Sequence, residues 1–210
     1  RTRVRHFMIF FIFVVTSINY AHRATFSIAG GAASRELGLS PIATGYILSA
    51  FAWAYAFAQV PGGALLDRFG TKRVYATAIA LWSVFTFSQG FAGFIPGLSA
   101  IAMLFALRFM VGLADAPSFP GNARIVAAWF PSSERGTASA IFNSAQYFSL
   151  VAFAPLMGWT VHHFGWRAVF YVMGALGLVA ALAFARFVHD PVRHPRINQA
   201  ELEHIESGGG

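Results

Sequence analysis

The chain carries at residues 62–73 the stretch Gly62-Gly63-Ala64-Leu65-Leu66-Asp67-Arg68-Phe69-Gly70-Thr71-Lys72-Arg73. This short, charged segment stands between two apolar runs, each long enough to cross a bilayer. A connection of this length leaves no room for a domain, so it must join two antiparallel membrane helices. The stretch therefore predicts an all-α membrane protein.

The composition of the chain also indicates a membrane protein. Charged residues make up only 11% of the 210 residues, against roughly 25% in an ordinary soluble domain, and hydrophobic residues make up 57%. The chain has no cysteine, so neither a disulfide framework nor a thiolate metal site is available. The net charge of +7 comes from short basic clusters between apolar runs, a pattern of membrane topology and not of nucleic-acid binding.

Six apolar stretches are long enough to span the hydrocarbon core, which takes about 20 helical residues. We place them near residues 7–30, 42–66, 74–95, 98–128, 138–161 and 168–188. Residues 1–189 thus form a six-helix transmembrane bundle, and the polar residues 190–210 form the start of a cytoplasmic linker. Six helices followed by a linker are the N-terminal half of a twelve-helix transporter, so we expect a C-terminal six-helix half as its partner.

The distribution of Lys and Arg predicts the orientation in the membrane. The start of the chain, the second loop, the fourth loop and the tail are basic, whereas the other loops offer only Arg35 and Arg167. Because positively charged loops stay on the cytoplasmic side, we expect both termini of this segment in the cytoplasm and the bundle in the inner (plasma) membrane.

A weak internal repeat accompanies these spans. The pattern Gly63-x5-Phe69-Gly70-x3-Val74 returns as Gly158-x5-Phe164-Gly165-x3-Val169. The first copy falls on the cytoplasmic side and the second on the outer side, as two inverted three-helix repeats would give. Chance is the alternative, because Gly is common at tight helix turns.

Polar residues interrupt the first span at Asn19, Tyr20, His22 and Arg23. An ionisable group at membrane depth costs at least about 2.5 kcal/mol, so each one needs a reason. Arg23 shares a helix face with Asn19 and Tyr20, and its guanidinium can hold a carboxylate in two-point contact. The alternative is that Arg23 lies near the outer interface and reaches water.

The fourth span carries Arg108 and Asp115. Seven residues are nearly two helical turns, so both side chains point the same way about 10 Å apart along the axis. An acid and a base on one inward face can pair in one state and separate in another, and we expect protonation of Asp115 to release Arg108. A permanent structural ion pair is the alternative. Pro117 and Pro120 follow and predict a bend in the helix.

Further polar side chains lie in the second and fifth spans. They are Tyr55 and Gln59, and Asn143, Gln146 and Tyr147. Each set can hydrogen-bond a polyhydroxylated solute, or it can hold neighbouring helices together. With the first and fourth spans, they predict one polar cavity in which Asn143 is also a substrate-binding residue.

The loop residues Asp67, Arg68, Gly70, Lys72 and Arg73 are expected to act as a conformational latch. Gly70 permits a turn with positive φ, and Asp67 can cap the following helix or pair with an Arg on a neighbouring one. Charge pairs that break and re-form can hold one face of a rocking transporter closed. A purely topological role for the basic residues is the alternative.

The sequence contains no pairing of a nucleophile with a base and no cluster of metal ligands. The adjacent His162 and His163 have no suitable spacing to other ligands. We therefore predict no enzymatic activity, no cofactor and no metal.

Longer runs of residues resemble a known family. They are Ile18-Asn19-Tyr20-Ala21-His22-Arg23-Ala24-Thr25, Ser49-Ala50-Phe51-Ala52-Trp53-Ala54-Tyr55, Arg108-Phe109-Met110-Val111-Gly112-Leu113-Ala114-Asp115-Ala116-Pro117, Ala128-Trp129-Phe130-Pro131 and Arg135-Gly136-Thr137-Ala138-Ser139-Ala140-Ile141-Phe142-Asn143-Ser144-Ala145-Gln146-Tyr147. Together with the charged turn at residues 67–73, they resemble the major facilitator superfamily. Within it they are most similar to sugar-acid transporters of the anion:cation symporter family, of the glucarate, galactarate and galactonate type.

This resemblance implies proton-driven import of a sugar-acid anion by alternating access. It carries over Tyr20, Arg23, Tyr55, Arg108 and Gln146 as residues of the substrate site or its gate. The substrate anion, the proton and the lipid bilayer are the implied partners.

Two positions depart from the family pattern. Asp115 stands where the family usually has Glu, and His22 stands where it usually has Asp. Imidazole is neutral or cationic but never anionic, so we expect the proton stoichiometry or pH dependence to differ, with Asp115 as the main proton carrier and His22 as a second proton-coupling candidate. An uncoupled uniporter or exchanger of organic anions, and a non-transporting membrane sensor or fragment, stay open as alternatives.

Overall fold

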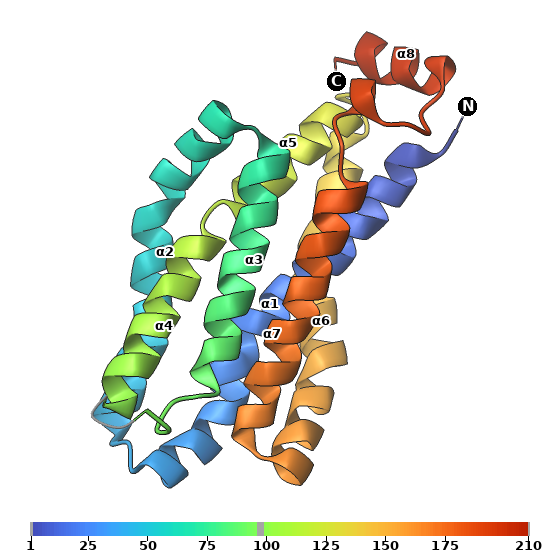
Figure 1. The fold of residues 1–210 in the computed structure, drawn as a ribbon. Coiled ribbons are helices and arrows are strands. Elements are labelled where there is room, and N and C mark those ends of the chain that lie inside the picture. The colour runs from blue at the N-terminus through green and yellow to red at the C-terminus, as the bar shows by residue number, and fades with distance from the viewer. Residues whose placement is uncertain (1, 96–98, 210) are drawn as a thin grey trace.

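The computed structural model describes residues 2–95 and 99–209, and those ranges contain helices and no strand (Figure 1). The main helices are α1 (Val4–Leu37), α2 (Pro41–Phe69), α3 (Thr71–Gln89), α4 (Ala100–Asp115), α5 (Ser118–Trp129), α6 (Arg135–Phe164) and α7 (Trp166–Phe187). A 3₁₀ turn, η1 (Pro191–Arg193), and a short helix, α8 (Gln199–Ser207), follow them. The predicted all-α fold is confirmed.

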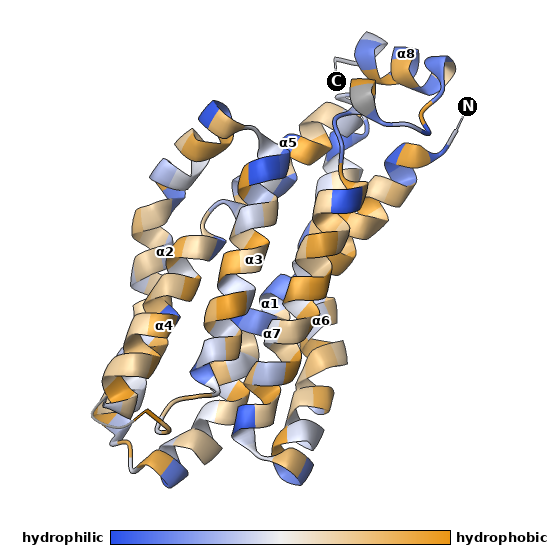
Figure 2. Ribbon diagram, viewed as in Figure 1, coloured by the Kyte–Doolittle hydropathy of each residue, from blue (hydrophilic) through white to orange (hydrophobic). Residues whose placement is uncertain are grey.

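The exterior of the bundle is apolar along its length. Five helical segments are long and apolar enough to cross a membrane: α1, α2, α4 with α5, α6 and α7. Large apolar side chains such as Val60, Val151 and Leu182 are 84%, 77% and 73% exposed, and hydrophilic residues are concentrated toward the ends (Figure 2). The remaining predicted span, residues 74–95, corresponds to α3, which is 19 residues long and packs against α4 and α7 inside the same bundle.

Two one-residue connections reproduce the repeat predicted from the sequence. Gly70 joins α2 to α3 with a φ of 83°, and Gly165 joins α6 to α7 with a φ of 82°. Glycine suits both positions because a positive φ is unfavourable for residues that carry a Cβ. The two junctions lie at opposite ends of the bundle (Figure 1), so the same turn occurs in inverted orientation, as two three-helix repeats require.

The fourth predicted span, residues 98–128, consists of two helices. The first residue of this span lies outside the described ranges. The first helix, α4, ends at Asp115, and the second, α5, begins at Ser118. Pro117 and Pro120 supply no backbone N–H to the helix ladder, so the helix breaks there. The break brings the Asp115 and Ser118 side chains together at a bend in the middle of the bundle.

The third predicted span, residues 74–95, is also shorter in the structure, because α3 ends at Gln89. Gly90 starts a series of turns, and Gly93 has a φ of 86° that ends any helical continuation.

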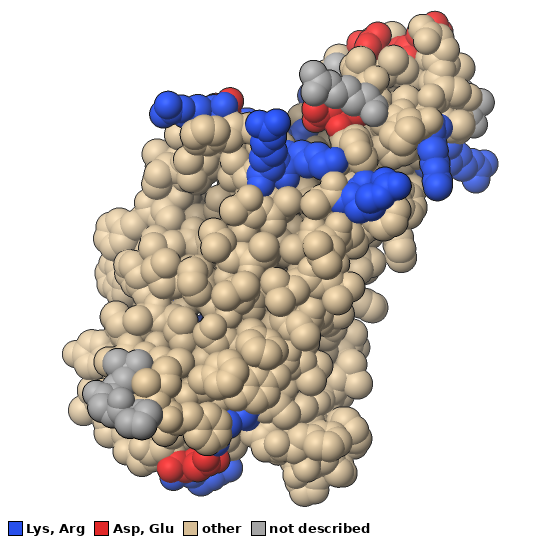
Figure 3. Space-filling model, in the orientation of Figure 1, with Lys and Arg blue, Asp and Glu red and all other residues tan. Residues whose placement is uncertain are grey.

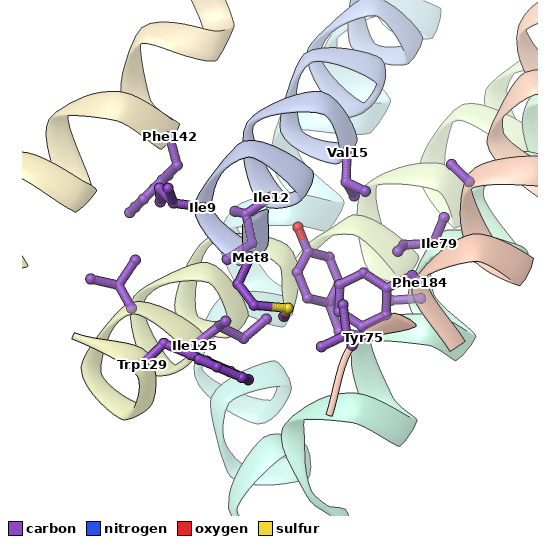
Figure 4. Close-up of a cluster of buried hydrophobic side chains, with 14 of the residues drawn as sticks. Met8, Ile9, Ile12, Val15, Tyr75, Ile79, Ile125, Trp129, Phe142 and Phe184 are labelled. Atoms are coloured by element: carbon purple, nitrogen blue, oxygen red, sulfur yellow. The ribbon is translucent and has the colours of Figure 1, made fainter. Parts of the chain in front are cut away.

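A cluster of buried apolar side chains joins α1, α3, α5, α6 and α7 (Figure 4). The cluster includes Met8, Ile9, Ile12 and Val15 of α1, Tyr75 and Ile79 of α3, Ile125 and Trp129 of α5, Phe142 of α6 and Phe184 of α7. Because lipid tails are as apolar as these side chains, the helices associate through van der Waals packing and not through removal of apolar surface from water.

The segment after α7 folds back onto the end of the bundle where the chain begins (Figure 1). Glu201 of α8 is buried and accepts hydrogen bonds from the backbone N–H groups of Val4 (3.2 Å) and Arg5 (3.1 Å) and from the Thr2 hydroxyl. The first turn of α1 has no acidic residue and no side-chain cap of its own. The carboxylate of α8 therefore satisfies N–H groups that the helix start leaves without intrahelical partners.

Charged side chains gather at the two ends of the bundle. On the face drawn in Figure 3, Lys and Arg are concentrated at the end that carries both chain termini, and a wide uncharged belt separates this end from a smaller charged group at the other. This arrangement matches a bundle whose middle is immersed in hydrocarbon.

Candidate functional site

The centre of the site is an ion pair between α1 and α4. Arg23 Nε lies 2.7 Å from Asp115 Oδ2, and the Asp115 side chain is only 2% exposed. The other carboxylate oxygen, Oδ1, accepts hydrogen bonds from Asn19 Nδ2 at 2.5 Å and from Ser118 Oγ at 2.8 Å. Neither Arg23 Nε nor Asp115 Oδ2 has an aligned hydrogen bond within the described part of the chain. The pair is therefore held by charge attraction and not by a two-point hydrogen bond between guanidinium and carboxylate.

Aromatic rings surround the Arg23 guanidinium. Its central carbon lies 4.8 Å from the ring centroid of Tyr20, 4.6 Å from that of Tyr55 and 5.5 Å from that of Phe51. Cation–π contacts of this kind hold a guanidinium in place without neutralising it. The structure therefore brings together three of the predicted site residues, Tyr20, Arg23 and Tyr55, around one positive charge.

Arg108 occupies a separate aromatic slot. Its guanidinium carbon is 5.7 Å from the ring centroid of Phe26 and 5.3 Å from that of Phe51. The side chain is buried, and Nε and Nη1 have no hydrogen-bond partner among the described residues. Arg108 and Asp115 are not paired in this conformation: Asp115 pairs with Arg23, which reaches it from another helix. The permanent Arg108–Asp115 ion pair, given above as the alternative, is therefore not what the structure shows.

A cavity of about 310 Å³ opens beside the ion pair. It is lined by Tyr20, Arg23, Ala24, Gln146, Tyr147 and Leu150. A second hollow of about 10 Å³, the size of one water molecule, lies between α1, α5 and α6 and includes Asn143, Asn122 and Ser118 in its lining. Gln146 thus lines the larger cavity and Asn143 the smaller hollow, whereas Tyr55 and Gln59 line neither.

His22 lies at a different helix interface. Its ring packs edge-on against Trp82 at 6.4 Å, and its Nδ1 is 3.3 Å from the Thr86 hydroxyl, both on α3. A Cβ on Gly177 of α7 would lie 2.7 Å from His22 Cε1. Adjacent residues of an α-helix point about 100° apart, so His22 faces α3 and α7 while Arg23 faces α4.

The predicted latch residues lie at the α2–α3 junction and not in the cavity. Asp67 pairs with Arg124 Nη2 of α5 at 2.5 Å, which is the second of the two arrangements expected for this carboxylate. Gly70 has the expected positive φ, and the Arg68 guanidinium lies 5.3 Å from the Phe69 ring.

Sequence reasoning missed three parts of the site. Ser118 follows Asp115 by three residues, a spacing at which side chains meet across a helix bend, and this was the available signal. The other two missed residues are Phe26 and Phe51, which hold the Arg108 guanidinium. The sequence carried no signal for them, because a Phe in an apolar span looks like any lipid-facing or core residue. Within the described ranges, no group of His, Asp and Glu is arranged to hold a metal ion.

Comparisons with known proteins agree with this architecture. The sequence pattern described as the Major Facilitator Superfamily matches residues 12–206. The probable galactarate/D-glucarate transporter GudP of Bacillus subtilis (strain 168) is 59% identical over 210 residues, which are 100% of this chain and 46% of that relative. The D-galactonate transporter of Escherichia coli O6:H1 is 37% identical over 99% of this chain and 47% of its own length.

A solved structure shares the fold at low sequence identity. The inward-facing, unoccupied crystal structure of a bacterial homologue of the human lysosomal transporter Spinster matches with a TM-score of 0.78 at 20% identity. The match covers 97% of this chain and 47% of that one.

The chain is thus a multi-pass, all-helical membrane protein with the fold of a transporter. It belongs to the Major Facilitator Superfamily. It spans about half the length of the curated relatives it matches. These relatives are named as transporters, which supports the prediction that the chain is not an enzyme.

Proposed function

We propose that the chain contributes one half of a transporter that imports a sugar-acid anion together with protons. The observation that carries the proposal is the position of Arg23, whose guanidinium both pairs with buried Asp115 and lines the 310 Å³ cavity. One cation is available to two competing anions, the carboxylate of Asp115 and a carboxylate in the cavity. The names of the similar relatives, with galactarate, D-glucarate and D-galactonate, favour a hexarate or aldonate as the substrate.

Competition for Arg23 provides a mechanism for coupling. Protonation of Asp115 removes the charge that holds Arg23, and the free guanidinium then binds the substrate carboxylate in two-point contact. Tyr20, Tyr55, Gln146 and Asn143 surround the hydroxylated part of the anion. When the substrate leaves, Arg23 returns to Asp115 and the proton is released.

Differential affinity between two states turns this exchange into transport. A ligand shifts a conformational equilibrium only by its difference in affinity for the two states. The Asp67–Arg124 pair, with Arg68, Gly70, Lys72 and Arg73 around it, is the latch that opens and closes one face as the two halves of the protein move. Arg108, which has a buried charge and no ion-pair partner among the described residues, takes a carboxylate of the substrate in one of these states.

The orientation follows from charge. Lys and Arg are concentrated at the end of the bundle with both termini (Figure 3), and the positive-inside rule supports a cytoplasmic position for this end. We propose this orientation in the inner membrane.

The first test is uptake of labelled D-glucarate by cells that express the full-length reading frame, with and without a protonophore. Accumulation that collapses with the proton gradient supports symport. Uptake that only equilibrates and is indifferent to the protonophore favours the uncoupled uniporter or exchanger. Binding without uptake favours a sensor.

The role of His22 is tested separately with His22→Asp. Because an acid at this position adds an anionic proton site to α1, we expect a changed proton-to-substrate ratio or a shifted pH optimum. An unchanged ratio and optimum would remove His22 from the coupling mechanism and leave it as a packing residue between α1, α3 and α7.

A further inference from the structure

Two hollows adjoin at the α2–α3 junction, outside the substrate cavity. The first, called here the charged hollow, has a volume of about 580 Å³, and its charged or titratable lining consists of Lys72, Arg73, Arg124, His189 and Asp190. The second, called here the apolar groove, has about 370 Å³ and lies between α2, α3 and α4. Phe69 and Arg73 line both, so the two hollows lie side by side, and together they are called here the depression.

Positive charge is in excess in the charged hollow. Arg124 is neutralised by Asp67, whereas no ion pair involves Lys72 or Arg73 within the described residues. Asp190 supplies the single carboxylate among the described residues that line this hollow. The two unpaired cations therefore exceed the available negative charge by one, and an anion would be stabilised beside them.

The apolar groove is open to the outside of the bundle. Leu65 and Leu81 on its walls are 45% and 44% exposed, as is Phe69 at 52% where the groove meets the charged hollow. Ala114 and Pro117, at the break between α4 and α5, also line it. Such a surface is suited to a flexible hydrocarbon chain, which needs no directional contact.

We propose that this depression binds one anionic phospholipid, with its phosphate beside Lys72 and Arg73 and an acyl chain in the apolar groove. The assignment rests on charge and polarity together: a hollow with an excess of positive charge and an exposed apolar groove share Phe69 and Arg73, near the charged end of the bundle. Basic pockets between membrane helices bind anionic head groups for this reason. The lipid contacts α2, α3 and α4, and it lies next to the Asp67–Arg124 pair.

The test uses the full-length protein purified in a neutral detergent and native mass spectrometry of its lipid adducts. Phosphatidylglycerol and phosphatidylcholine with identical acyl chains are titrated in parallel. We expect tighter binding of phosphatidylglycerol, and a loss of about fivefold in its affinity for either Lys72→Gln or Arg73→Gln, the effect expected for one cation at a lipid surface. Arg186→Gln, which removes an exposed cation that lines neither hollow, is the matched control and should leave the affinity unchanged.

A second variant tests the apolar groove. Thr77→Trp places a large side chain in the groove without changing charge, and we expect it to weaken binding of phosphatidylglycerol while the melting temperature of the protein is retained. Equal binding of the two lipids, equal effects of Arg73→Gln and Arg186→Gln, or no effect of Thr77→Trp would each overturn the proposal. Competition by inorganic phosphate that is insensitive to Thr77→Trp would identify a site for free phosphate instead.

Discussion

Arg23 and Asp115 form an ion pair between α1 and α4, with Nε and Oδ2 2.7 Å apart. The two partners differ in their access to solvent, since the Asp115 side chain is 2% exposed and the Arg23 side chain 22%. The arginine therefore has one side against a buried carboxylate and another toward the cavity. Under the proposed function, an anion that enters the cavity competes with the carboxylate of Asp115 for the same guanidinium.

We expect Asp115→Asn to abolish proton-driven accumulation while exchange of substrate across the membrane continues. Asparagine has nearly the same shape but carries no charge, so Arg23 stays available to substrate and no proton is bound or released. Uptake against a gradient and counterflow in proteoliposomes containing the full-length protein distinguish the two activities. Glu36→Gln is the control, because it removes an exposed carboxylate that pairs with Arg167 at one end of the bundle. Persistent accumulation in Asp115→Asn would contradict the coupling role.

Arg108→Met is expected to abolish substrate binding without lowering stability. The buried Arg108 cation has no ion-pair partner among the described residues, and its guanidinium packs between the rings of Phe26 and Phe51. A methionine of similar length packs in the same slot, and it removes the desolvation cost of a buried charge that has no ion-pair partner. Thermal melting checks the predicted stability, and binding of labelled glucarate checks the predicted loss of substrate binding.

The matched comparison for this variant is Arg23→Met. It leaves the Asp115 carboxylate buried and unpaired, which costs about 3 kcal/mol or more. If Arg108→Met lowered the melting temperature as much as Arg23→Met, then Arg108 would have an essential structural partner.

Gly177→Ala should destabilise the contact of α7 with α1 and α3. A Cβ at this position would lie 2.1 Å from Ser83 Oγ and 2.7 Å from His22 Cε1, and both residues are buried. Overpacking of this kind costs about 1–3 kcal/mol, and the loss should appear as a lower melting temperature. Gly31→Ala is the control in α1: nothing lies within 4 Å of its Cβ, so it should melt at or above the temperature of the unchanged protein. Equal melting temperatures of Gly177→Ala and Gly31→Ala would mean that the interface of α7 with α1 and α3 adjusts to the added methyl group.

Glu201→Gln should loosen the docking of α8. The buried carboxylate satisfies N–H groups at the start of α1, and the neutral amide loses the attraction to the positive end of the helix, about 1 kcal/mol. Hydrogen exchange of the amides in residues 4–8 and 199–207 should accelerate severalfold. Glu203→Gln changes the same charge on an exposed face of α8 and should have no such effect. Identical exchange in both variants would show that the carboxylate is not what holds α8.

The sequence by itself determined the features that depend on local physics. Apolar runs longer than the hydrocarbon core predict membrane helices whatever lies beside them. Gly70 and Gly165 mark one-residue turns because their positive φ is a property of the backbone alone. The shared face of Asn19, Tyr20 and Arg23 follows from helical periodicity, and the break after Asp115 follows from the chemistry of proline.

Only the tertiary structure decided which charges meet. Arg108 and Asp115 share a helix face, but Asp115 pairs with Arg23 because α1 lies against α5, which begins just after Asp115. Arg108 is held instead between Phe26 and Phe51. His22 and Arg23 are neighbours in sequence, yet they face different helices. Pairing between helices depends on how the helices are arranged around one another, and this arrangement is set by packing over the whole bundle and not by the spacing of residues along one helix.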